Sequence, residues 1–407
     1  MDRLGPFEPR PILAVAVSGG ADSLALAILA NRWAGRQNGS IIALVVDHGL
    51  RPASADEARI TVERLAGIGI RARLLLLSDL ARGPALAERA RIARYAILAE
   101  ACRDVGSVHL LLGHHAADQV ETLVMRVLRG SGTHGLAGMA ALRETAGLRL
   151  LRPLLDIDPT RLRHFLTASG VDWIEDPSNQ DASALRPRLR QRLAGQAPEA
   201  TGLPAAMASV GRLRSREEAG IASVLAKRAA IRPEGFALLS SGRIDAAALS
   251  ALVRTIAGLA YPPNAGQIAD WAAEPRPATV AGVRMMPAGR LGDGWLVVRE
   301  EAAIMAPVQA THGVVWDNRF RLSGARGNPN KITAGKLGSD SVRFRRDSDL
   351  PSAVLRTLPA LRSGGRVIAV PHLGYAADAE CPFTVLFAPP QPAAGPCFVA
   401  ARQANSG

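Results

Sequence analysis

The sequence predicts an α/β protein with a doubly wound parallel sheet, followed by a mainly helical middle domain and a small α+β C-terminal domain. Up to about residue 193, apolar runs of strand length alternate with stretches of helical periodicity, the pattern of a parallel sheet covered by helices on both faces. The alternation stops at an Ala- and Pro-rich stretch. After it, 246–275 look helical, 278–299 read as short strands, and a β-rich segment follows after about residue 306. We therefore expect domains at 1–193, 194–305 and 306–407.

The expected strands of the first domain are apolar runs, which cover 12–17, 41–46, 70–77 and 108–112. The expected helices cover 24–33, 54–66, 86–104 and 117–128. The helix at 54 begins with the capping-box pattern Ser54-x-x-Glu57. Because open α/β sheets bind ligands at the carboxyl ends of their strands, the residues directly after each strand are the candidate functional residues.

The first strand is followed by SGGADS (18–23), which opens the first helix. Glycines let the backbone fold closely around a phosphate, and the N–H groups of a helix N-terminus point at it. The loop is not of the Walker type, because no Gly-Lys-Ser/Thr follows the glycines. Asp22 within a phosphate-binding loop requires a cation, so we expect Mg²⁺ between Asp22 and the phosphates. The alternative interpretation is a Gly-Gly turn with Asp22 capping a helix.

Polar residues also follow the second and fourth strands. DHGLRP (47–52) would lie where a nucleotide base or ribose binds, although a simple Gly/Pro turn has the same pattern. GHHAADQVET (113–122) places Asp118 and Glu121 on one helix face, where they can ligate Mg²⁺ or hold an ammonium group. Acids in a first helical turn also simply complement the helix dipole. A zinc site is not expected, because a third ligand at metal spacing is not evident.

The composition limits the class of binding partner and the cellular compartment that we expect. The net charge of +13 favours a polyanionic partner such as a nucleic acid, while the 4% aromatic content argues against broad stacking platforms. Cys102, Cys381 and Cys397 form no Cys-x-x-Cys and no disulfide framework, which fits a reducing cytoplasm. No apolar run approaches 18 residues and residues 1–10 lack a signal-peptide pattern, so no membrane span is expected.

Several arginine runs are candidates for phosphate contacts. Arg91 and Arg94 share a helix face, and Arg129 begins a glycine-rich loop (129–139) that is typical of a lid or an RNA-facing segment. The further candidates are Arg186, Arg188, Arg190 and Arg192, at every second position, and Arg343, Arg345 and Arg346 near the C-terminus. A solvated charged surface is the alternative interpretation of each run.

The order of these motifs resembles that of the bacterial tRNA(Ile)-lysidine synthetases, which are N-type ATP pyrophosphatases of the PP-loop superfamily. The shared motifs are SGGADS, DHGLR, ERARIARY (88–95), GHHAADQVET, RGSGTHGLAGM (129–139), RPLL (152–155), WIEDPSN (173–179) and RPRLR (186–190). Together they cover about 11–192. The resemblance implies an adenine-nucleotide α-hydrolase-like fold in the first domain. In the C-terminal half the resemblance is weak.

The resemblance also implies a reaction. ATP adenylates the C2 carbonyl oxygen of the wobble cytidine in a tRNA(Ile) with a CAU anticodon, and the ε-amine of free lysine then displaces AMP to give lysidine. The specificity of the tRNA changes from methionine to isoleucine. The implied cofactors are ATP and Mg²⁺, and the implied compartment is the cytoplasm. The oligomeric state stays open, a homodimer included.

The resemblance assigns roles to individual residues. The ATP-binding residues would be Ser18, Gly19, Gly20, Ala21, Asp22, Ser23, His48 and His114. The catalytic residues would be Asp22, Asp118, Glu121 and Arg94, with Mg²⁺ on Asp22 and Asp118. The tRNA-binding residues would be Arg129, Arg186, Arg188, Arg190, Arg343, Arg345 and Arg346.

The sequence departs from the family pattern at Ala117, where a second acid is common, and at Pro187, where Asn is common. The first departure weakens a multi-carboxylate metal site, and the second puts the local backbone in doubt. A tRNA thiolase or an amide-forming synthetase with the same loop is a rival hypothesis, but the cysteines these enzymes need are missing. A catalytically inert tRNA-binding protein is another, and the intact Ser18, Asp22 and Asp118 argue against it.

Overall fold

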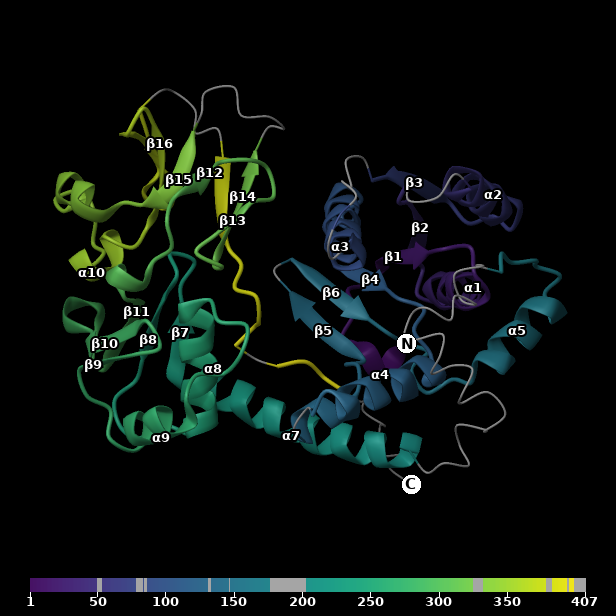
Figure 1. Cartoon of the computed structure of the whole chain (residues 1–407), viewed down its shortest axis with the longest axis horizontal. Coiled ribbons are helices and arrows are strands. Elements are labelled where there is room, and N and C mark those ends of the chain that lie inside the picture. Colours follow the sequence, from purple (N-terminus) through teal and green to yellow (C-terminus); the bar gives the residue numbers. More distant parts are fainter. Residues whose placement is uncertain are drawn as a thin grey trace. The chain divides into compact units, whose positions relative to one another are not determined.

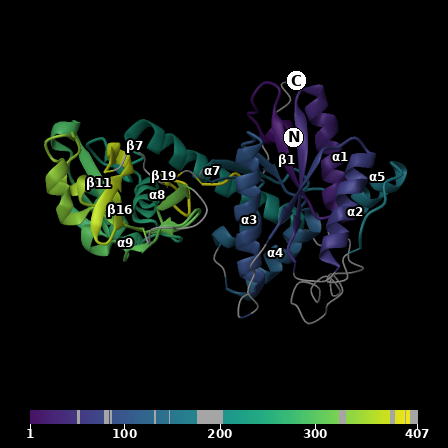
Figure 2. The same ribbon diagram turned by 90° about the horizontal axis from the view of Figure 1, so that it is seen from above.

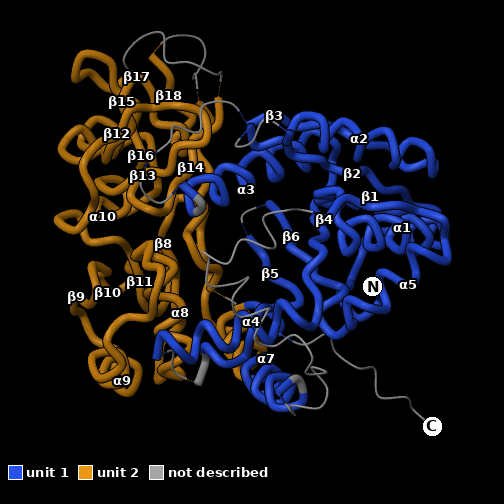
Figure 3. Tube along the Cα trace, turned by 45° about the vertical axis from the view of Figure 1, so that its right-hand side comes forward, with its two compact units in different colours: residues 1–216, 396–407 blue, residues 217–395 orange. Residues whose placement is uncertain are grey.

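The computed structural model describes residues 1–49, 53–77, 83, 86–130, 133–145, 147–175, 203–324, 332–377, 383–393 and 395–398 (Figure 1). The chain divides into two units: Met1–Arg216 with Pro396–Gly407, and Glu217–Gly395 (Figure 3). The division falls inside one helix, α7 (Leu203–Arg228). The boundary expected at 193/194 lies outside the described residues, and the one expected at 305/306 lies inside the second unit.

The first unit contains a six-stranded sheet with the order β3-β2-β1-β4-β6-β5. Its strands are β1 (Ile12–Val17), β2 (Ser40–Asp47), β3 (Ala72–Leu76), β4 (His109–Leu111), β5 (Leu142–Thr145) and β6 (Leu148–Leu151). All neighbouring strands pair in parallel except β5, which runs antiparallel to β6. The predicted strand–helix alternation is confirmed, but the sheet is mixed because the chain turns back at Gly147 (φ +76°) between β5 and β6.

Helices cover both faces of this sheet (Figure 2). They are α1 (Ala21–Arg36), α2 (Ser54–Gly67), α3 (Leu86–Asp104), α4 (Ala116–Leu128) and α5 (Pro159–Ala168). Leu13, Val15 and Val17 of β1 pack in a core with α1, α2 and α5, whereas Ala14 and Ala16 pack in a second core with α3. Because successive side chains of a strand point to opposite faces, one apolar run supplies both cores.

The order of the strands predicts where the sheet binds a ligand. β1 has β2 on one side and β4 on the other, so the chain reverses its direction of winding between β1 and β4. Doubly wound sheets bind ligands at such a switch point, outside the carboxyl ends of the strands. The loops that begin at Ser18 and at Leu112 leave the sheet at this point.

The second unit begins with an antiparallel five-stranded sheet, order β7-β8-β11-β10-β9. Its strands are β7 (Ala229–Ile231), β8 (Phe236–Leu239), β9 (Ala278–Val280), β10 (Val283–Pro287) and β11 (Trp295–Arg299), and its helices are α8 (Ala246–Ala257) and α9 (Ala265–Ala273). The core between α8, α9 and the sheet includes Ala237, Met285 and Val297. The expected helices within 246–275 and short strands within 278–299 are confirmed, and β7 and β8 are the addition to a segment that was expected to be mainly helical.

Two further sheets complete the second unit. One has the order β12-β15-β16-β17-β18 and the other β13-β14-β19. Their strands are β12 (Val308–Gln309), β13 (Val315–Trp316), β14 (Phe320–Gly324), β15 (Thr333–Lys336), β16 (Pro359–Ser363), β17 (Arg366–Val370), β18 (Tyr375–Ala376) and β19 (Phe383–Phe387). The short helix α10 (Ser352–Leu355) lies between β15 and β16 in the chain. The described 3₁₀ turns are η1 (Asp2–Leu4), η2 (Thr133–Ala137), η5 (Gly289–Leu291), η6 (Glu301–Ala303), η7 (Gly338–Phe344) and η8 (Pro371–Leu373).

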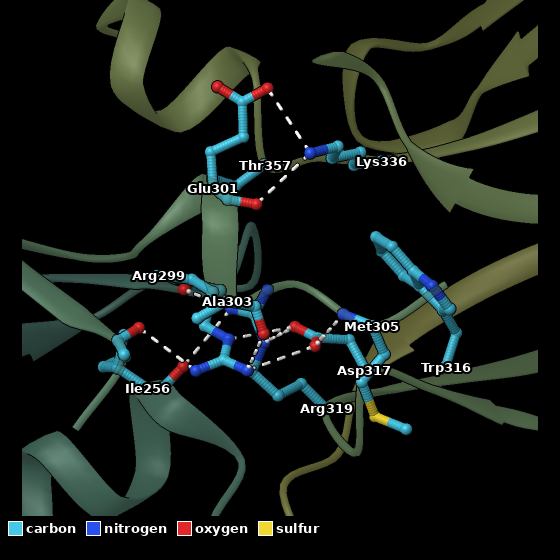
Figure 4. A network of polar contacts seen from close by, with 12 residues as sticks. Ile256, Arg299, Glu301, Ala303, Met305, Trp316, Asp317, Arg319, Lys336 and Thr357 are labelled. Atoms are coloured by element: carbon cyan, nitrogen blue, oxygen red, sulfur yellow. Dashed lines mark hydrogen bonds and ion pairs between the residues drawn. The ribbon is translucent and has the colours of Figure 1, made fainter. Parts of the chain in front are cut away.

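A buried polar network joins the parts of the second unit (Figure 4). The Asp317 carboxylate accepts hydrogen bonds from Nε of Arg319 (2.7 Å) and Nε of Arg299 (3.3 Å). Nη1 of Arg319 donates to the carbonyl oxygens of Gly235 (3.1 Å) and Ile256 (3.3 Å). The network therefore links β11 and the end of α8 to the turn between β13 and β14. In the described part of the chain, no helix combines the length and apolarity needed to cross a bilayer.

Candidate active site

The loop after β1 has a backbone that only glycine adopts easily. Gly19 has a φ of +86°, and a Cβ atom there would lie 2.4 Å from Oγ1 of Thr61 on α2. The carbonyl oxygen of Gly19 accepts a hydrogen bond from the backbone N–H of Ile174 (2.9 Å). Gly20 is the N-cap of α1, so the first N–H groups of that helix open toward the loop. The sequence prediction of a tight Gly-Gly turn before a helix is confirmed.

Ser23 holds the loop closed from the first turn of α1. Its hydroxyl accepts a hydrogen bond from the backbone N–H of Ser18 (3.1 Å) and donates to the carbonyl oxygen of Gly20 (3.0 Å). A Cβ atom at Gly113 would lie 3.2 Å from the backbone of Ser23. The loops after β1 and β4 are therefore packed together, with glycine at their point of closest approach.

Two carboxylates, from the first turns of α1 and α4, lie near the same ring nitrogen of one imidazole. Nε2 of His115 is 3.4 Å from Oδ2 of Asp22 and 3.6 Å from Oδ2 of Asp118. The backbone N–H of His115, the N-cap of α4, donates to the same Asp118 oxygen (3.1 Å). The sequence analysis named both acids as candidates but gave His115 no role. Its position directly after a strand was a signal, but the pair of adjacent histidines did not show which ring would face the acids.

The Asp22 and Asp118 carboxylates fit a magnesium ion. Oδ1 of Asp22 is buried and has no hydrogen-bond partner among the described residues, as expected for an oxygen that a ligand completes. Mg²⁺ is usually held by one or two carboxylates together with substrate phosphates and water. No group of three or more His, Cys, Asp or Glu in the described ranges could hold a metal ion, so substrate oxygens would complete the coordination.

Glu121 lies one turn along α4 from Asp118. It is 2% exposed, whereas the side chain of Asp118 is 21% exposed. A small substrate therefore reaches Asp118 more easily than Glu121. The role of Glu121 in catalysis stays a prediction.

A cluster of positive and neutral nitrogen groups lies beside the acids. Burial, reinforced by the nearby Arg152, lowers the pKa of His114 to about 4, so this imidazole is neutral at pH 7. Burial also lowers the pKa of Arg94, on α3, and of Arg152, which directly follows β6. The Arg91 guanidinium lies over the ring of Tyr95, 5.1 Å from its centroid.

The arginines of this cluster form no ion pair with a carboxylate in the part of the chain that the structure describes. Arg152 is 8% exposed; its Nη1 donates to the carbonyl oxygen of Ala140 (2.8 Å), and its Nε is buried with no hydrogen-bond partner. A buried cation without a counter-charge is costly in a folded protein. We name Arg91, Arg94 and Arg152, together with the neutral His114 beside them, the cationic cluster, and its chemistry suits an anionic ligand. Arg152 was not among the predicted site residues.

Residues 3–197 match the family of PP-loop domains. The tRNA(Ile)-lysidine synthase of Ruegeria pomeroyi is 34% identical over 390 residues, which cover 91% of this chain and 90% of that protein. The chain belongs to the tRNA(Ile)-lysidine synthase family. The family expected from the order of the motifs is thereby confirmed.

Other members of the tRNA(Ile)-lysidine synthase family align over shorter ranges. The protein of a Bradyrhizobium species (strain BTAi1) is 40% identical over 218 residues, covering 53% of this chain and 61% of that protein. Among solved structures, the U34-tRNA thiolase NcsA of Methanococcus maripaludis is 20% identical, with a TM-score of 0.43 over 52% of this chain and 76% of that chain.

In this lysidine synthase family member, the turn after β2 is shaped by Asp47. Its carboxylate accepts hydrogen bonds from Oγ of Ser54 (2.5 Å) and from the backbone N–H of Gly49 (2.9 Å), and these bonds lower the pKa of Asp47. His48, which lies between Asp47 and Gly49 in the chain, is half-buried. The predicted contact of His48 with the nucleotide stays a prediction.

The glycine-rich segment after α4 is held to that helix over its described part. Nη1 of Arg126 donates to the carbonyl oxygens of Gly135 and Gly138 (both 2.7 Å). The side-chain amide of Gln119 bonds both the N–H (2.6 Å) and the carbonyl oxygen (3.1 Å) of Met139. We name Thr133–Ala140 the α4 loop. Arg129, the C-cap of α4, is exposed at its start.

The remaining predicted tRNA contacts lie elsewhere. Arg186, Arg188 and Arg190 are outside the described residues. In the second unit, the Arg343 guanidinium lies 5.7 Å from the ring centroid of Phe344 and 5.9 Å from that of Tyr375. Nη2 of Arg345 donates to Oγ of Ser352 (3.0 Å), and Arg346 is exposed.

Proposed function

We propose that this chain joins free lysine to the C2 position of the wobble cytidine in a tRNA(Ile) with a CAU anticodon, converting ATP to AMP and pyrophosphate. The observation that supports this most directly is the convergence of Asp22 and Asp118 on His115, beside the closed Ser18–Ser23 loop. This arrangement joins a phosphate-binding backbone to two carboxylates within one crevice. The substrates in this proposal are those that membership of the tRNA(Ile)-lysidine synthase family implies.

In the first step, the C2 carbonyl oxygen of the cytidine attacks the α-phosphorus of ATP. The bond from that phosphorus to the bridging oxygen breaks, and pyrophosphate leaves. The N–H groups at the start of α1 and the cationic cluster stabilise the negative charge that moves onto the pyrophosphate. Asp22 and Asp118 would hold Mg²⁺, which neutralises phosphate charge when it is bound.

In the second step, the ε-amine of lysine attacks C2, the C2–O bond breaks, and AMP leaves with both electrons of that bond. Lysine arrives as an ammonium ion, so one proton must be removed before the nitrogen can attack. Once the pyrophosphate has left and Asp118 is no longer bound to the ion, its partly exposed carboxylate holds the ammonium group and accepts its proton, with Glu121 one turn behind it. Adenylation is needed because AMP is a far better leaving group than an oxide.

The tRNA is held by charge. Arg129 at the C-terminal end of α4, and Arg343, Arg345 and Arg346 in the second unit, are our candidates for its phosphates, in keeping with the net charge of +13. The target base must leave the anticodon stack, which costs less for a loop nucleotide than for a paired one. The cytoplasmic location and a homodimer stay predictions.

The test is the release of AMP from ATP with Mg²⁺, omitting the tRNA and then lysine. AMP should form only with tRNA(Ile) carrying a CAU anticodon, and nucleoside mass spectrometry should detect lysidine only when lysine is added. A transcript with U at the wobble position is the matched control and should give neither product. AMP formation with another tRNA or another amine would contradict the proposed substrates, and no AMP in any mixture would favour an inert tRNA-binding protein.

A further inference from the structure

The last described residues of the chain return to the first unit. The backbone N–H of Leu142, in β5, donates to the carbonyl oxygen of Cys397 (3.0 Å), and the N–H of Cys397 donates back to the carbonyl oxygen of Leu142 (3.0 Å). These two bonds form an antiparallel bridge on the edge of the catalytic sheet. Residues 217–395 fold as the second unit, so the tail reaches this edge only after that whole unit has been made.

Phe398 anchors the tail. It is 7% exposed and packs against Ala137 and Ala140 of the α4 loop and against Val210 of α7. The Arg214 guanidinium lies 4.3 Å from the centroid of its ring. The backbone N–H of Phe398 donates to Oγ of Ser215 (2.9 Å). The ring is thus held between the helix that precedes the second unit and the loop that follows α4.

The α4 loop continues directly into the cationic cluster. The carbonyl oxygen of Ala140, whose side chain contacts Phe398, accepts the hydrogen bond from Nη1 of Arg152 (2.8 Å). The next carbonyl, of Ala141, accepts from the backbone N–H of Arg152 (2.8 Å). Arg152 makes no ion pair with an acid of the described chain; its position is fixed by these carbonyls and by a side-chain hydrogen bond with Tyr95. A shift of Ala140 would therefore shift the guanidinium.

We infer that Pro396–Phe398 is a strap that positions Arg152, and that Phe398 is its positioning residue. Phe398 touches no reacting group; it acts through the α4 loop. The inference rests on the proposed function only in taking the cationic cluster as part of the ATP site. It makes Pro396–Phe398 a structural part of the catalytic unit, although the second unit separates the two in sequence.

The test compares three full-length variants. Phe398→Ala should speed hydrogen exchange of the backbone amides in 135–142 about tenfold, because the loop loses its packing partner. The same variant should raise the apparent KM for ATP about tenfold with a smaller change in kcat, because a binding group is misplaced and not removed. Phe398→Leu, which refills most of the space, should restore both values.

Phe383→Ala is the matched control, because Phe383 is also buried (4% exposed) but lies in β19 of the second unit. It should leave exchange in 135–142 and the KM for ATP unchanged. If Phe398→Ala does not fold, Ser215→Ala removes only the hydrogen bond to Phe398 and should act in the same direction with a smaller effect. Unchanged exchange and KM in Phe398→Ala, or equal effects in Phe383→Ala, would overturn the inference.

Hydrogen exchange needs no turnover, so it separates the two proposals. Faster exchange in Phe398→Ala together with a wild-type protein that makes no AMP would support the strap and reject the proposed function. Normal exchange together with normal AMP formation would reject the strap and keep the proposed function.

Discussion

Arg152 in the first unit and Arg319 in the second are both buried guanidinium groups, but their surroundings differ. Arg319 donates to the Asp317 carboxylate at 2.7 Å and to two backbone carbonyls. Arg152 donates to a backbone carbonyl and shares a hydrogen bond with the side chain of Tyr95, and the cations beside it are Arg143 and Arg91. Each group keeps one nitrogen without a partner, Nη2 of Arg319 and Nε of Arg152, so the difference lies in the counter-charge.

This difference separates a structural charge from a functional one. The fold supplies the anion for Arg319, and breaking such a pair leaves an uncompensated buried charge. The fold supplies no carboxylate for Arg152 among the described residues, and we propose that a bound ligand supplies the anion. Asp22 completes the pattern, because its Oδ1 is also buried without a partner. We infer that a buried cation without a counter-charge and a carboxylate oxygen without a partner mark where substrate and ion bind.

The largest effect is expected from Asp22→Asn, which removes the carboxylate charge and keeps the shape. AMP release should fall about 100- to 1,000-fold, because the pyrophosphate charge loses its neutralisation. The affinity for tRNA should stay within about threefold, because phosphate contacts elsewhere dominate it. The measurement is single-turnover AMP formation with a filter-binding assay for tRNA.

Asp56→Asn is the control for that change, because Asp56 is exposed on α2 and pairs only at the surface with Arg59 (3.5 Å). It should leave AMP formation unchanged. Full activity in Asp22→Asn would reject the metal and phosphate roles of Asp22.

The buried His114 should make stability depend on pH. Its pKa is about 4 in the folded chain, against about 6.5 in the unfolded chain, so the unfolded state binds the proton first as pH falls. The contribution of neutral His114 to the free energy of unfolding is fully present above pH 6.5. It is lost progressively as the pH falls to 4, by at most about 3 kcal/mol. Urea unfolding from pH 7.5 to pH 4 measures it.

His114→Gln should reduce this loss of stability between pH 6.5 and 4, because glutamine does not titrate. His164→Gln, at an exposed position on α5, is the control and should keep the wild-type pH dependence. Identical curves for His114→Gln and the wild type would mean that His114 is not buried as a neutral group.

The smallest effect is expected in the second unit, at the surface. Replacing Arg343, Arg345 and Arg346 together by Ala should raise the apparent KM for tRNA and make the slope of log affinity against log salt shallower by about 2 to 3. Arg276→Ala, at another exposed position of this unit, should leave the slope unchanged. An unchanged slope in the triple variant would make these arginines ordinary surface charge.

The sequence predicted the parts of the site that are local. SGGADS contains its own turn, helix start and acid, and the rule for strand ends brought Asp22 and Asp118 to the same edge. Arg152 was missed because the four-residue strand before it, β6, is too short for a clear periodic signal. The contact of Cys397 with Leu142 joins distant parts of the chain, and no local sequence pattern predicts it.

The middle of the chain shows the same limit. The sequence predicted its helices, because α8 has a full apolar face with eight buried residues. β7 and β8 have three and four residues, too few to distinguish from loops. Those strands are held by pairing with β11, which lies far along the chain. These strands are therefore stabilised by tertiary contacts, which the local sequence of each segment does not reveal.

The most direct test of the central claim is the free energy of unfolding of two matched variants, Arg152→Met and Arg319→Met. Removing Arg319 leaves Asp317 buried with one partner fewer, so this variant should lose about 3–5 kcal/mol. Removing Arg152 takes away a charge that the fold does not balance, so stability should change by less than about 1 kcal/mol while AMP release falls about 100-fold. Equal losses of stability in the two variants, with AMP release intact in Arg152→Met, would contradict the assignment of the unbalanced cluster to ligand binding.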